Sequence, residues 1–341
     1  DPHPEMRAVL YDENSDLFAA GHLRPPDDPD LVWNFVAARR NHHPAADILG
    51  YRAPAGRPIG YYMNLQFTST GSHFAQAESP WKMERNFRMV KASGDGPLRF
   101  AIVNIGNTRE HVMEGAAFAS MMWDFDSYSS DAYLREFCST YYGEENAAEV
   151  ADAYRAFYDS YWQPRPSDLL DFPRQYLFHD MRLMRAAGYL LKQIEKKEQR
   201  PNFLAGSYLG IQPEPGGDEL DALEAGTARS VERLRRVTSA CDALRLRIPS
   251  RGRAFFDDNL RLQAHLMLET NLLVQSLIRA YRSMPNDEDQ RTHLREALGH
   301  ADAMQSILDR GEHGSFDGWY DRENLFGLSR ARGHIQRLIS N

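Results

Sequence analysis

The first third of the chain alternates short apolar runs with polar turns. The predicted strands are 31–36, 59–67 and 98–105. Ser79-Pro80 opens a segment with Met83, Phe87 and Val90 at helical spacing, which predicts a helix there. Further helices are expected at 6–21 and 111–125. Strands that alternate with helices in this way are typical of a parallel sheet with right-handed crossovers.

From residue 111 onward the pattern is helical and contains no convincing strand. The expected helices are 130–141, 144–162, 168–198, 218–247, 254–283, 287–310 and 322–339. Proline- and glycine-containing linkers separate several of them. An aromatic stripe in the second helix is expected to lie in the core or an interface. We therefore predict an α/β domain at 1–125 and a helical bundle domain at 126–341.

Three parallel strands are too few to bury both faces of a sheet. A closed (β/α)8 barrel needs roughly 250 residues, which leaves two interpretations. The chain contains either a small open sheet or the last strands of a (β/α)8 barrel whose earlier strands lie elsewhere. We favour the barrel. The first residues, DPHPEM, include neither a start methionine at position 1 nor a signal peptide, as expected for a processed or excised end.

Composition narrows the class of protein. The 341 residues are 42% hydrophobic and 26% charged, as in ordinary globular proteins. A net charge of -8 argues against nucleic acid or an anionic membrane as the main partner. No apolar run is long enough for a transmembrane helix. Cys138 and Cys241 have no metal-ligand spacing, so two buried free thiols are expected, with a single disulfide as the alternative.

An ordered series of short motifs resembles glycoside hydrolase family 115, the xylan α-1,2-glucuronidases. The motifs are Trp33, Gly60-Tyr61-Tyr62, Asn104-Ile105-Gly106-Asn107 with Arg109, Met122-Trp123-Asp124, Phe137 to Tyr142-Gly143, Phe255-Phe256, Gln263-Ala264 and Gly318-Trp319. The resemblance covers about 6–165 and 250–335.

The resemblance implies the last three strands of a (β/α)8 barrel, with the active site at their carboxyl ends, followed by a helical domain. It implies an exo-acting, inverting hydrolase that removes glucuronic or methylglucuronic acid from xylan or a related acidic polysaccharide. It further implies an extracellular or periplasmic enzyme, a homodimer formed through the helical domain, and no metal or other cofactor.

The resemblance also implies a sugar pocket that contains Tyr61, Tyr62, Asn104, Asn107 and Arg109. The chain departs from the family pattern at several positions. The family usually has an acidic pair and an asparagine after the strand tryptophan, where this chain has 34–37, NFVA. Met63 stands for a histidine, Asn107 for an aspartate and Arg109 for a lysine, which puts the sugar specificity in doubt.

Glycoside hydrolysis requires two carboxyl groups that flank the scissile bond. Glu110 is the best catalytic candidate, because it follows the third strand at the expected active face. Glu78 and Glu114 are further carboxylates near strand ends. For all three, a solvated or helix-terminal carboxylate is the alternative.

The long polar stretch 37–58 is expected to be functional, because loops of this length inside a domain usually are. Arg39, Arg40, His42 and His43 could form a cationic rim for an acidic glycan. The alternative is a surface loop whose charges pair with nearby acids. A metal site at the two histidines is not expected, because adjacent residues seldom share a metal.

Tyr61 and Tyr62 should point to opposite faces of a strand, one into the core and the other toward the pocket. Asn64 and Gln66 share the parity of Tyr62 and are candidates for binding sugar hydroxyls, with a strand-end amide as the alternative.

Several aromatic and histidine residues have weaker functional interpretations. His73, Phe74 and Trp81 could form a stacking platform, although core packing is the simpler reading of Trp81. Trp319 and Tyr320 are candidates for contact with a partner subunit. The histidines within the later helices are expected to be structural; these are His265, His293 and His300.

Three functions remain open. They are a glycoside hydrolase, a non-catalytic glycan-binding or scaffold relative, and a helical interaction protein with an incidental α/β part. Adjacent, parallel strands would count against the third.

Overall fold

The computed structural model describes residues 5–11, 13–24, 26, 28, 30–36, 48, 50–66, 72–164, 177–200, 203–204, 209–284 and 286–340. The chain divides into two compact units. Unit 1 contains 1–67, 78–133 and 166–176, and unit 2 contains 68–77, 134–165 and 177–341. The boundary between the two domains was expected near residue 125. Residues 68–77, between the predicted strand at 59–67 and the helix that follows it, were not expected to group with the later helices.

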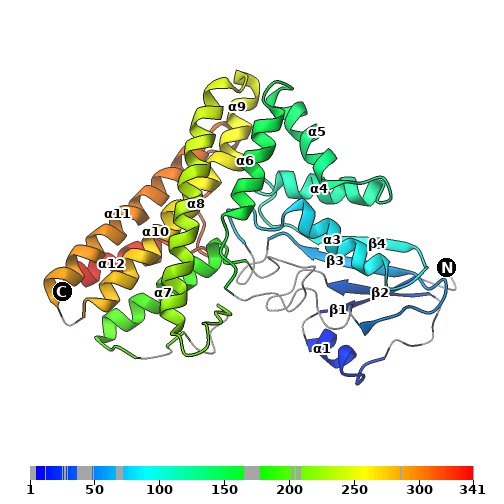
Figure 1. Cartoon of the computed structure of the whole chain (residues 1–341), viewed down its shortest axis with the longest axis horizontal. Coiled ribbons are helices and arrows are strands. Elements are labelled where there is room, and N and C mark those ends of the chain that lie inside the picture. Colours follow the sequence, from blue (N-terminus) through cyan, green and yellow to red (C-terminus); the bar gives the residue numbers. More distant parts are fainter. Residues whose placement is uncertain are drawn as a thin grey trace. The chain divides into compact units, whose positions relative to one another are not determined.

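Unit 1 is built on a four-stranded parallel sheet with the order β1-β2-β3-β4 (Figure 1). The strands are β1 (Met6–Leu10), β2 (Leu31–Val36), β3 (Ile59–Asn64) and β4 (Leu98–Asn104). Each strand pairs with the next one along the chain. The three predicted strands are therefore confirmed as parallel neighbours, and β1 adds a fourth.

The predicted helix at 6–21 is wrong in its first half. Residues 6–10 form β1, and only Glu13–Ala19 are helical, as α1. Ala8 pairs with Trp33 and Leu10 with Phe35, so β1 satisfies the backbone groups along one side of β2. Met6 and Arg7 are both exposed, so β1 lacks the regular alternation of buried and exposed side chains from which a strand is predicted.

One face of the sheet forms the core of unit 1. Helices α3 (Pro80–Lys91) and α4 (Val112–Trp123) contribute Phe87 and Phe118 to it, and Phe18 of α1 packs on the rings of β2. The start of α3 is as predicted. The Ser79 hydroxyl accepts the Lys82 N–H at 3.3 Å, and Pro80 occupies the first turn.

Unit 2 is helical. Its elements are α5 (Ser130–Tyr142, shared at its start with unit 1), α6 (Ala147–Asp159), α7 (Asp180–Lys196), α8 (Glu219–Arg247), α9 (Ser250–Phe256), a π-helical turn (Asp257–Arg261), α10 (Leu262–Arg282), α11 (Asp287–Gly311), a 3-10 turn (Gly314–Phe316) and α12 (Leu328–Ser340). Helix α10 packs against α7, α8 and α11, and α12 packs against α7 and α11. The chain is thus mostly helical, as the sequence predicts.

Gly226 does not interrupt α8. A Cβ atom at this position would lie 2.1 Å from the Trp162 ring, so the glycine allows the ring to pack directly on the helix backbone. Gly226 is therefore a close-packing position within the helix.

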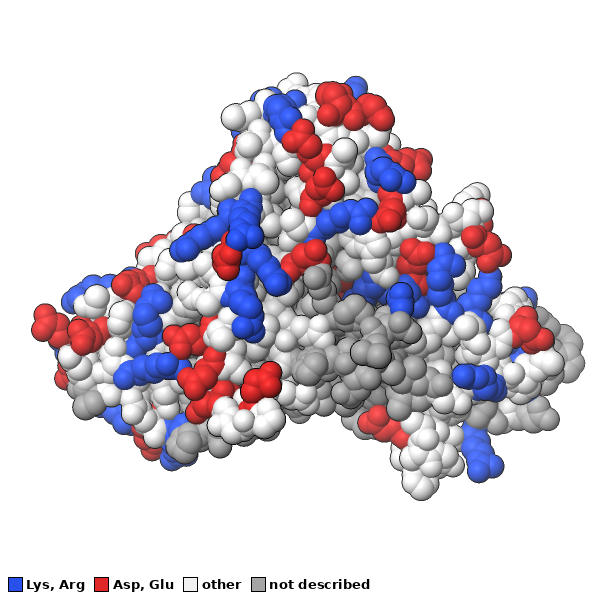
Figure 2. Space-filling view, viewed as in Figure 1, with Lys and Arg blue, Asp and Glu red and all other residues white. Residues whose placement is uncertain are grey.

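Acidic and basic side chains are interspersed over unit 2 on the face shown in Figure 2. Many form exposed pairs, such as Arg236 with Glu232 and Arg247 with Glu149. Both cysteines are buried free thiols, as predicted, and burial raises the pKa of each to about 12. Within the described ranges, no helix combines the length and apolarity that a bilayer crossing requires.

Candidate active site

The second face of the sheet in unit 1 carries polar side chains toward the carboxyl ends of the strands. Phe35, Tyr61 and Met63 belong to the apolar core. Because side chains alternate along a strand, Asn34, Tyr62 and Asn64 point to the opposite face. Asn104 pairs with Asn64 in register and shares that face. Carboxyl strand ends are where parallel α/β sheets bind ligands.

Asn34 lies in the middle of this polar face. Its side chain has no exposed surface, and neither its amide nitrogen nor its amide oxygen has a hydrogen-bond partner among the described residues. An unsatisfied buried polar group costs about 1–3 kcal/mol, and native proteins usually satisfy it with water or a ligand. Asn34 is therefore a binding candidate, although sequence reasoning treated it only as a departure from the family pattern.

Gln66 joins the ends of β3 and β4. Its Oε1 accepts the Gly106 N–H at 3.1 Å, and the Leu65 N–H donates to Asn104 O at 3.0 Å. A Cβ atom on Gly106 would lie 2.2 Å from Gln66 Oε1, so only glycine permits this approach. The two strand ends are locked together where the polar side chains gather.

The turn after β4 contains buried charged residues. Arg109, Glu110, His111 and Glu114 are all nearly inaccessible to solvent. The Glu110 N–H donates to Asn107 O at 3.2 Å, which shapes the turn, and His111 Nδ1 lies 3.0 Å from Glu114 Oε2. Buried ionisable groups at a strand end are a common feature of functional sites. Sequence reasoning did not find His111.

Several predicted residues lie apart from this polar face. Tyr61 is wholly buried, and its ring centroid is 3.5 Å from that of Phe87, so its assignment to the sugar pocket is corrected to the core. Burial, together with the charge of Glu78, raises its pKa well above the usual value. Tyr62 is on the other face as expected and packs edge-on against Tyr11. The predicted cationic rim lies outside the described residues; it comprises Arg39, Arg40, His42 and His43.

Two further candidates have structural partners. Lys82 Nζ lies 2.6 Å from a carboxylate oxygen of Glu78. The Trp81 indole N–H donates to Asp131 at 2.7 Å, and the ring is partly exposed rather than in the core. Over the described ranges, no group of three or more histidine, cysteine or acidic residues is arranged to hold a metal ion.

In unit 2, the carboxylate of Asp180 binds the backbone of the segment 72–77. It accepts the N–H groups of His73 at 3.0 Å, Phe74 at 2.6 Å and Ala75 at 3.0 Å. It also accepts the Met181 N–H at 2.7 Å. Burial alone would raise the pKa of Asp180. Hydrogen bonding and charge from His179, the charge of His73 and the Phe74 N–H outweigh burial and lower that pKa.

The side chains of the same segment are held at two further points. His73 Nε2 lies 2.7 Å from Glu323 Oε2, and Phe326 packs on both His73 and Phe74. The Gln76 N–H donates to Gln263 Oε1 at 2.9 Å, and its amide nitrogen donates to the Asn259 carbonyl at 2.8 Å. His73 and Phe74 are thus buried parts of unit 2.

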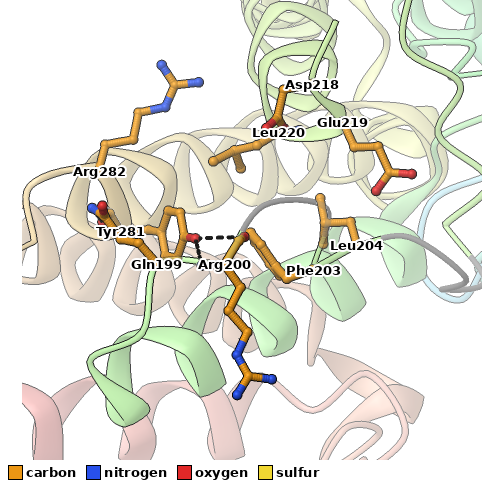
Figure 3. Close-up of a pocket in the computed structure, with 9 residues that line it drawn as sticks. All are labelled: Gln199, Arg200, Phe203, Leu204, Asp218, Glu219, Leu220, Tyr281 and Arg282. Atoms are coloured by element: carbon orange, nitrogen blue, oxygen red, sulfur yellow. Dashed lines mark hydrogen bonds between the residues drawn. The ribbon is translucent and has the colours of Figure 1, made fainter. Parts of the chain in front are cut away.

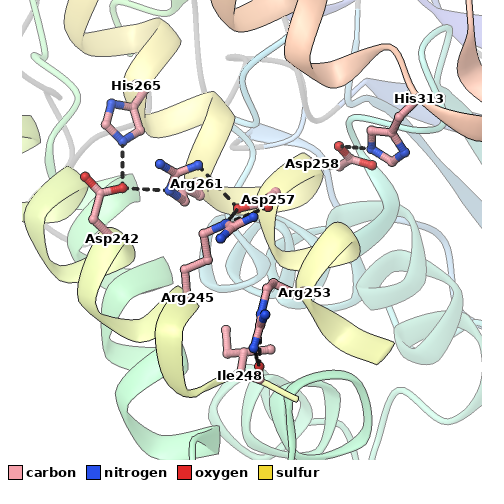
Figure 4. Close-up of polar contacts among 9 residues, drawn as sticks. All are labelled: Asp242, Arg245, Ile248, Arg253, Asp257, Asp258, Arg261, His265 and His313. Atoms are coloured by element: carbon pink, nitrogen blue, oxygen red, sulfur yellow. Dashed lines mark hydrogen bonds and ion pairs between the residues drawn. The ribbon is translucent and has the colours of Figure 1, made fainter. Parts of the chain in front are cut away.

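The Asn259 carbonyl belongs to the π-helical turn, which interrupts the regular helical ladder. The neighbouring Asp257 forms an ion pair with Arg245, and Asp258 Oδ1 lies 3.1 Å from His313 Nε2 (Figure 4). Asp242 binds Arg261 and His265 alongside them. The turn is therefore fixed by charges on its outer side and holds Gln76 through its backbone.

Unit 2 also contains a cavity of about 410 Å³ lined by residues of α8, α10 and 199–204 (Figure 3). Arg200 and Arg282 line it together with Asp218 and Glu219. Arg282 forms ion pairs with Asp221 and Glu224. These two carboxylates therefore neutralise the charge of Arg282 within the helical unit.

A parallel sheet wound in chain order, with amide and carboxyl groups collected where its strands end, is typical of the α/β class of proteins. Residues 3–167 match the model of glycosyl hydrolase family 115. The match confirms, over this part of the chain, the family resemblance expected from the sequence.

A solved structure shares the fold. It is a family GH115 4-O-methyl-α-glucuronidase, BtGH115A, with specificity for decorated arabinogalactans. The two chains are 13% identical with a TM-score of 0.55, and the match covers 98% of this chain. The chain spans 38% of the length of that structure. No curated protein matches the sequence.

Proposed function

We propose that the chain forms part of an exo-acting glycoside hydrolase that removes glucuronic or methylglucuronic acid side chains from xylan or a related acidic polysaccharide. The family match of residues 3–167 is the observation that carries this proposal. The buried polar groups at the ends of β2, β3 and β4 support it, because sugar hydroxyls are bound by amide and carboxyl groups of this kind.

Hydrolysis breaks the bond between the anomeric carbon and the glycosidic oxygen. One carboxyl group protonates the leaving oxygen, and another takes a proton from the water that attacks the anomeric carbon. We assign Glu110 to one of these two roles. Its burial in the turn after β4 supports the assignment.

Binding is proposed to involve the amides of Asn34, Asn64, Asn104 and Asn107, with Tyr62 beside them. We assign recognition of the uronate carboxylate to Arg109, because a guanidinium matches a carboxylate in two parallel hydrogen bonds. Arg39, Arg40, His42 and His43 remain proposed contributors to a cationic rim.

The wider architecture follows the same proposal. The sheet is proposed to be part of a (β/α)8 barrel, which its strictly sequential parallel order supports. The helices of unit 2 are proposed to form a bundle that carries a homodimer contact, with Trp319 and Tyr320 as candidates. An extracellular or periplasmic location is proposed because the polymeric substrate is found there.

The alternative is a non-catalytic glycan-binding relative. Asn34 and Asn107 favour it, because neutral amides occupy strand-end positions where the family usually has acids nearby. An amide can bind a sugar hydroxyl but cannot transfer a proton at neutral pH.

Incubation with glucuronoxylan tests the proposal. We expect released uronic acid, and an E110Q variant with activity reduced by about 100-fold or more. E136Q is the matched control, because Glu136 is exposed on α5, and it should retain full activity. Binding of the polysaccharide without release, by protein whose circular dichroism shows that it is folded, would support the alternative. If the folded protein neither binds the polysaccharide nor releases uronic acid from it, both the hydrolase function and the glycan-binding alternative are refuted.

A further inference from the structure

A second cavity of unit 2 lies between α7 and α12, and we call it the α7–α12 groove. Its volume is about 390 Å³, within the range of small-molecule sites. Its apolar lining includes Met181, Met184, Leu191, Leu325 and Phe326. Apolar side chains of α7 and of the segment before α12 provide a surface for a hydrophobic body.

Four basic side chains line the groove, and no Asp or Glu does so, as far as the structure describes the lining. They are Arg185, Lys192, Arg330 and His334. Lys192 and Arg330 form no ion pair with any residue in the described ranges. The cationic lining contrasts with the net charge of -8 of the whole chain and with the cavity in Figure 3, which Asp218 and Glu219 line as well as arginines.

His334 carries an unsatisfied polar atom in the groove lining. Its Nε2 is buried and makes no hydrogen bond within the described part of the chain. Glu195 is the nearest carboxylate at 3.4 Å, which is an ion-pair distance without hydrogen-bond geometry, and it is 58% exposed. A buried ring nitrogen that makes no hydrogen bond costs about 1–3 kcal/mol. An acceptor bound in the groove would remove this cost.

Gly188 lines the groove from the middle of α7. Glycine in a helix interior costs about 1 kcal/mol relative to alanine. Here no packing requirement explains it, since a Cβ atom on Gly188 would meet nothing within 4 Å. The open space allows an occupant to approach the helix backbone closely.

We propose that the α7–α12 groove binds a small amphiphilic carboxylate, with its apolar body against Leu325, which is 49% exposed, and its carboxylate at His334 and Arg330. The absence of acidic side chains in the described lining selects an anion, and the apolar walls disfavour a fully hydroxylated sugar acid. This binding site is separate from the polar strand ends of unit 1 and does not depend on the proposed hydrolase function.

Isothermal titration calorimetry of the whole chain with 4-hydroxycinnamate tests the proposal. We expect binding at least tenfold tighter than that of its neutral amide, 4-hydroxycinnamamide, and of glucuronate, which lacks the apolar body. A G188L variant should bind at least tenfold more weakly, because its side chain fills the groove. G299L is the matched control, because Gly299 in α11 also has open space around it, and it should bind as the wild type does.

The charge requirement has its own pair of variants. R330Q should weaken binding at least fivefold, while R295Q on the exposed side of α11 should leave it unchanged. Circular dichroism and solution mass accompany each measurement. Equal binding of acid and amide, unchanged binding by G188L, or no binding at millimolar probe would overturn the proposal. A wild-type dimer that G188L dissociates would also overturn it, because a second copy would then occupy the groove.

Discussion

His73 and Glu323 are 250 positions apart in the sequence, yet His73 Nε2 lies 2.7 Å from Glu323 Oε2. The imidazole is almost wholly buried, and the carboxylate is about 20% exposed. Burial tends to raise the pKa of Glu323, but the contact with His73 and the backbone N–H groups of Phe326 and Leu325 outweigh it and lower that pKa. The ionised carboxylate accepts, so Nε2 is the donor.

We expect E323Q to destabilise the protein by about 1–3 kcal/mol at pH 7 through loss of a charge-assisted hydrogen bond. The lowered pKa means that the carboxylate stabilises the fold above its ordinary pKa of 4.5 and that this contribution is lost as pH falls through the folded value. The difference between E323Q and the wild type, measured by urea unfolding, should therefore shrink toward pH 3. E232Q, in an exposed pair, should cost less than about 0.5 kcal/mol. A difference that does not change with pH would contradict the assignment.

Asp180 should be more sensitive to substitution. D180N replaces one acceptor oxygen by an amide donor that faces backbone N–H groups, and we expect a loss of about 2–4 kcal/mol at pH 7. Limited proteolysis should then cleave the segment 72–77 faster than in the wild type. D302N is the control, since Asp302 pairs with Arg332 while half exposed. Equal stability of the two variants would show that the Asp180 bonds contribute little.

Two glycines within helices should respond oppositely to alanine. In G226A the new Cβ would collide with the Trp162 ring, and we expect a net loss of about 1–3 kcal/mol despite the better helix propensity. In G299A the new Cβ meets open space, and a gain of about 0.5–1 kcal/mol is expected. Thermal unfolding of both variants checks the signs. A stabilised G226A would mean that Trp162 is displaced at little cost.

Asn34 offers a test of stability against function. Replacement by leucine removes two buried polar atoms that lack partners among the described residues, so we expect N34L to be more stable by about 1–3 kcal/mol. Glucuronoxylan binding or turnover should fall at the same time. N14L is the matched control, because Asn14 is exposed on α1, and it should change neither stability nor binding. A less stable N34L would indicate that water satisfies the amide.

The sequence predicted the elements whose apolar pattern is regular. Strands β2, β3 and β4 were predicted because residues such as Trp33 and Tyr61 lie in short apolar runs. Helix α3 was predicted because Phe87 lies at helical spacing from its apolar neighbours. Strand β1 was missed because only Ala8 and Leu10 face the core, and a helix follows almost at once. Five residues carry too little periodicity to separate the two states.

The candidate site residues also divide into those that a local sequence pattern predicts and those that it does not. Alternation predicted that Tyr61 and Tyr62 would face opposite ways, but not which of them would enter the core. The π-helical turn has no local sequence signal. The contacts of Asp180 join residues more than a hundred positions apart, and no spacing rule reaches that far.

The place of segment 72–77 has an evolutionary consequence. Its chain neighbours β3 and α3 belong to the sheet unit, while its own side chains fill the interior of the helical unit. Recombination at a single junction near residue 133 would therefore yield a helical half that lacks Phe74. The buried carboxylate of Asp180 would then lose the backbone N–H donors of the segment. The two halves are expected to be inherited together rather than exchanged as separate modules.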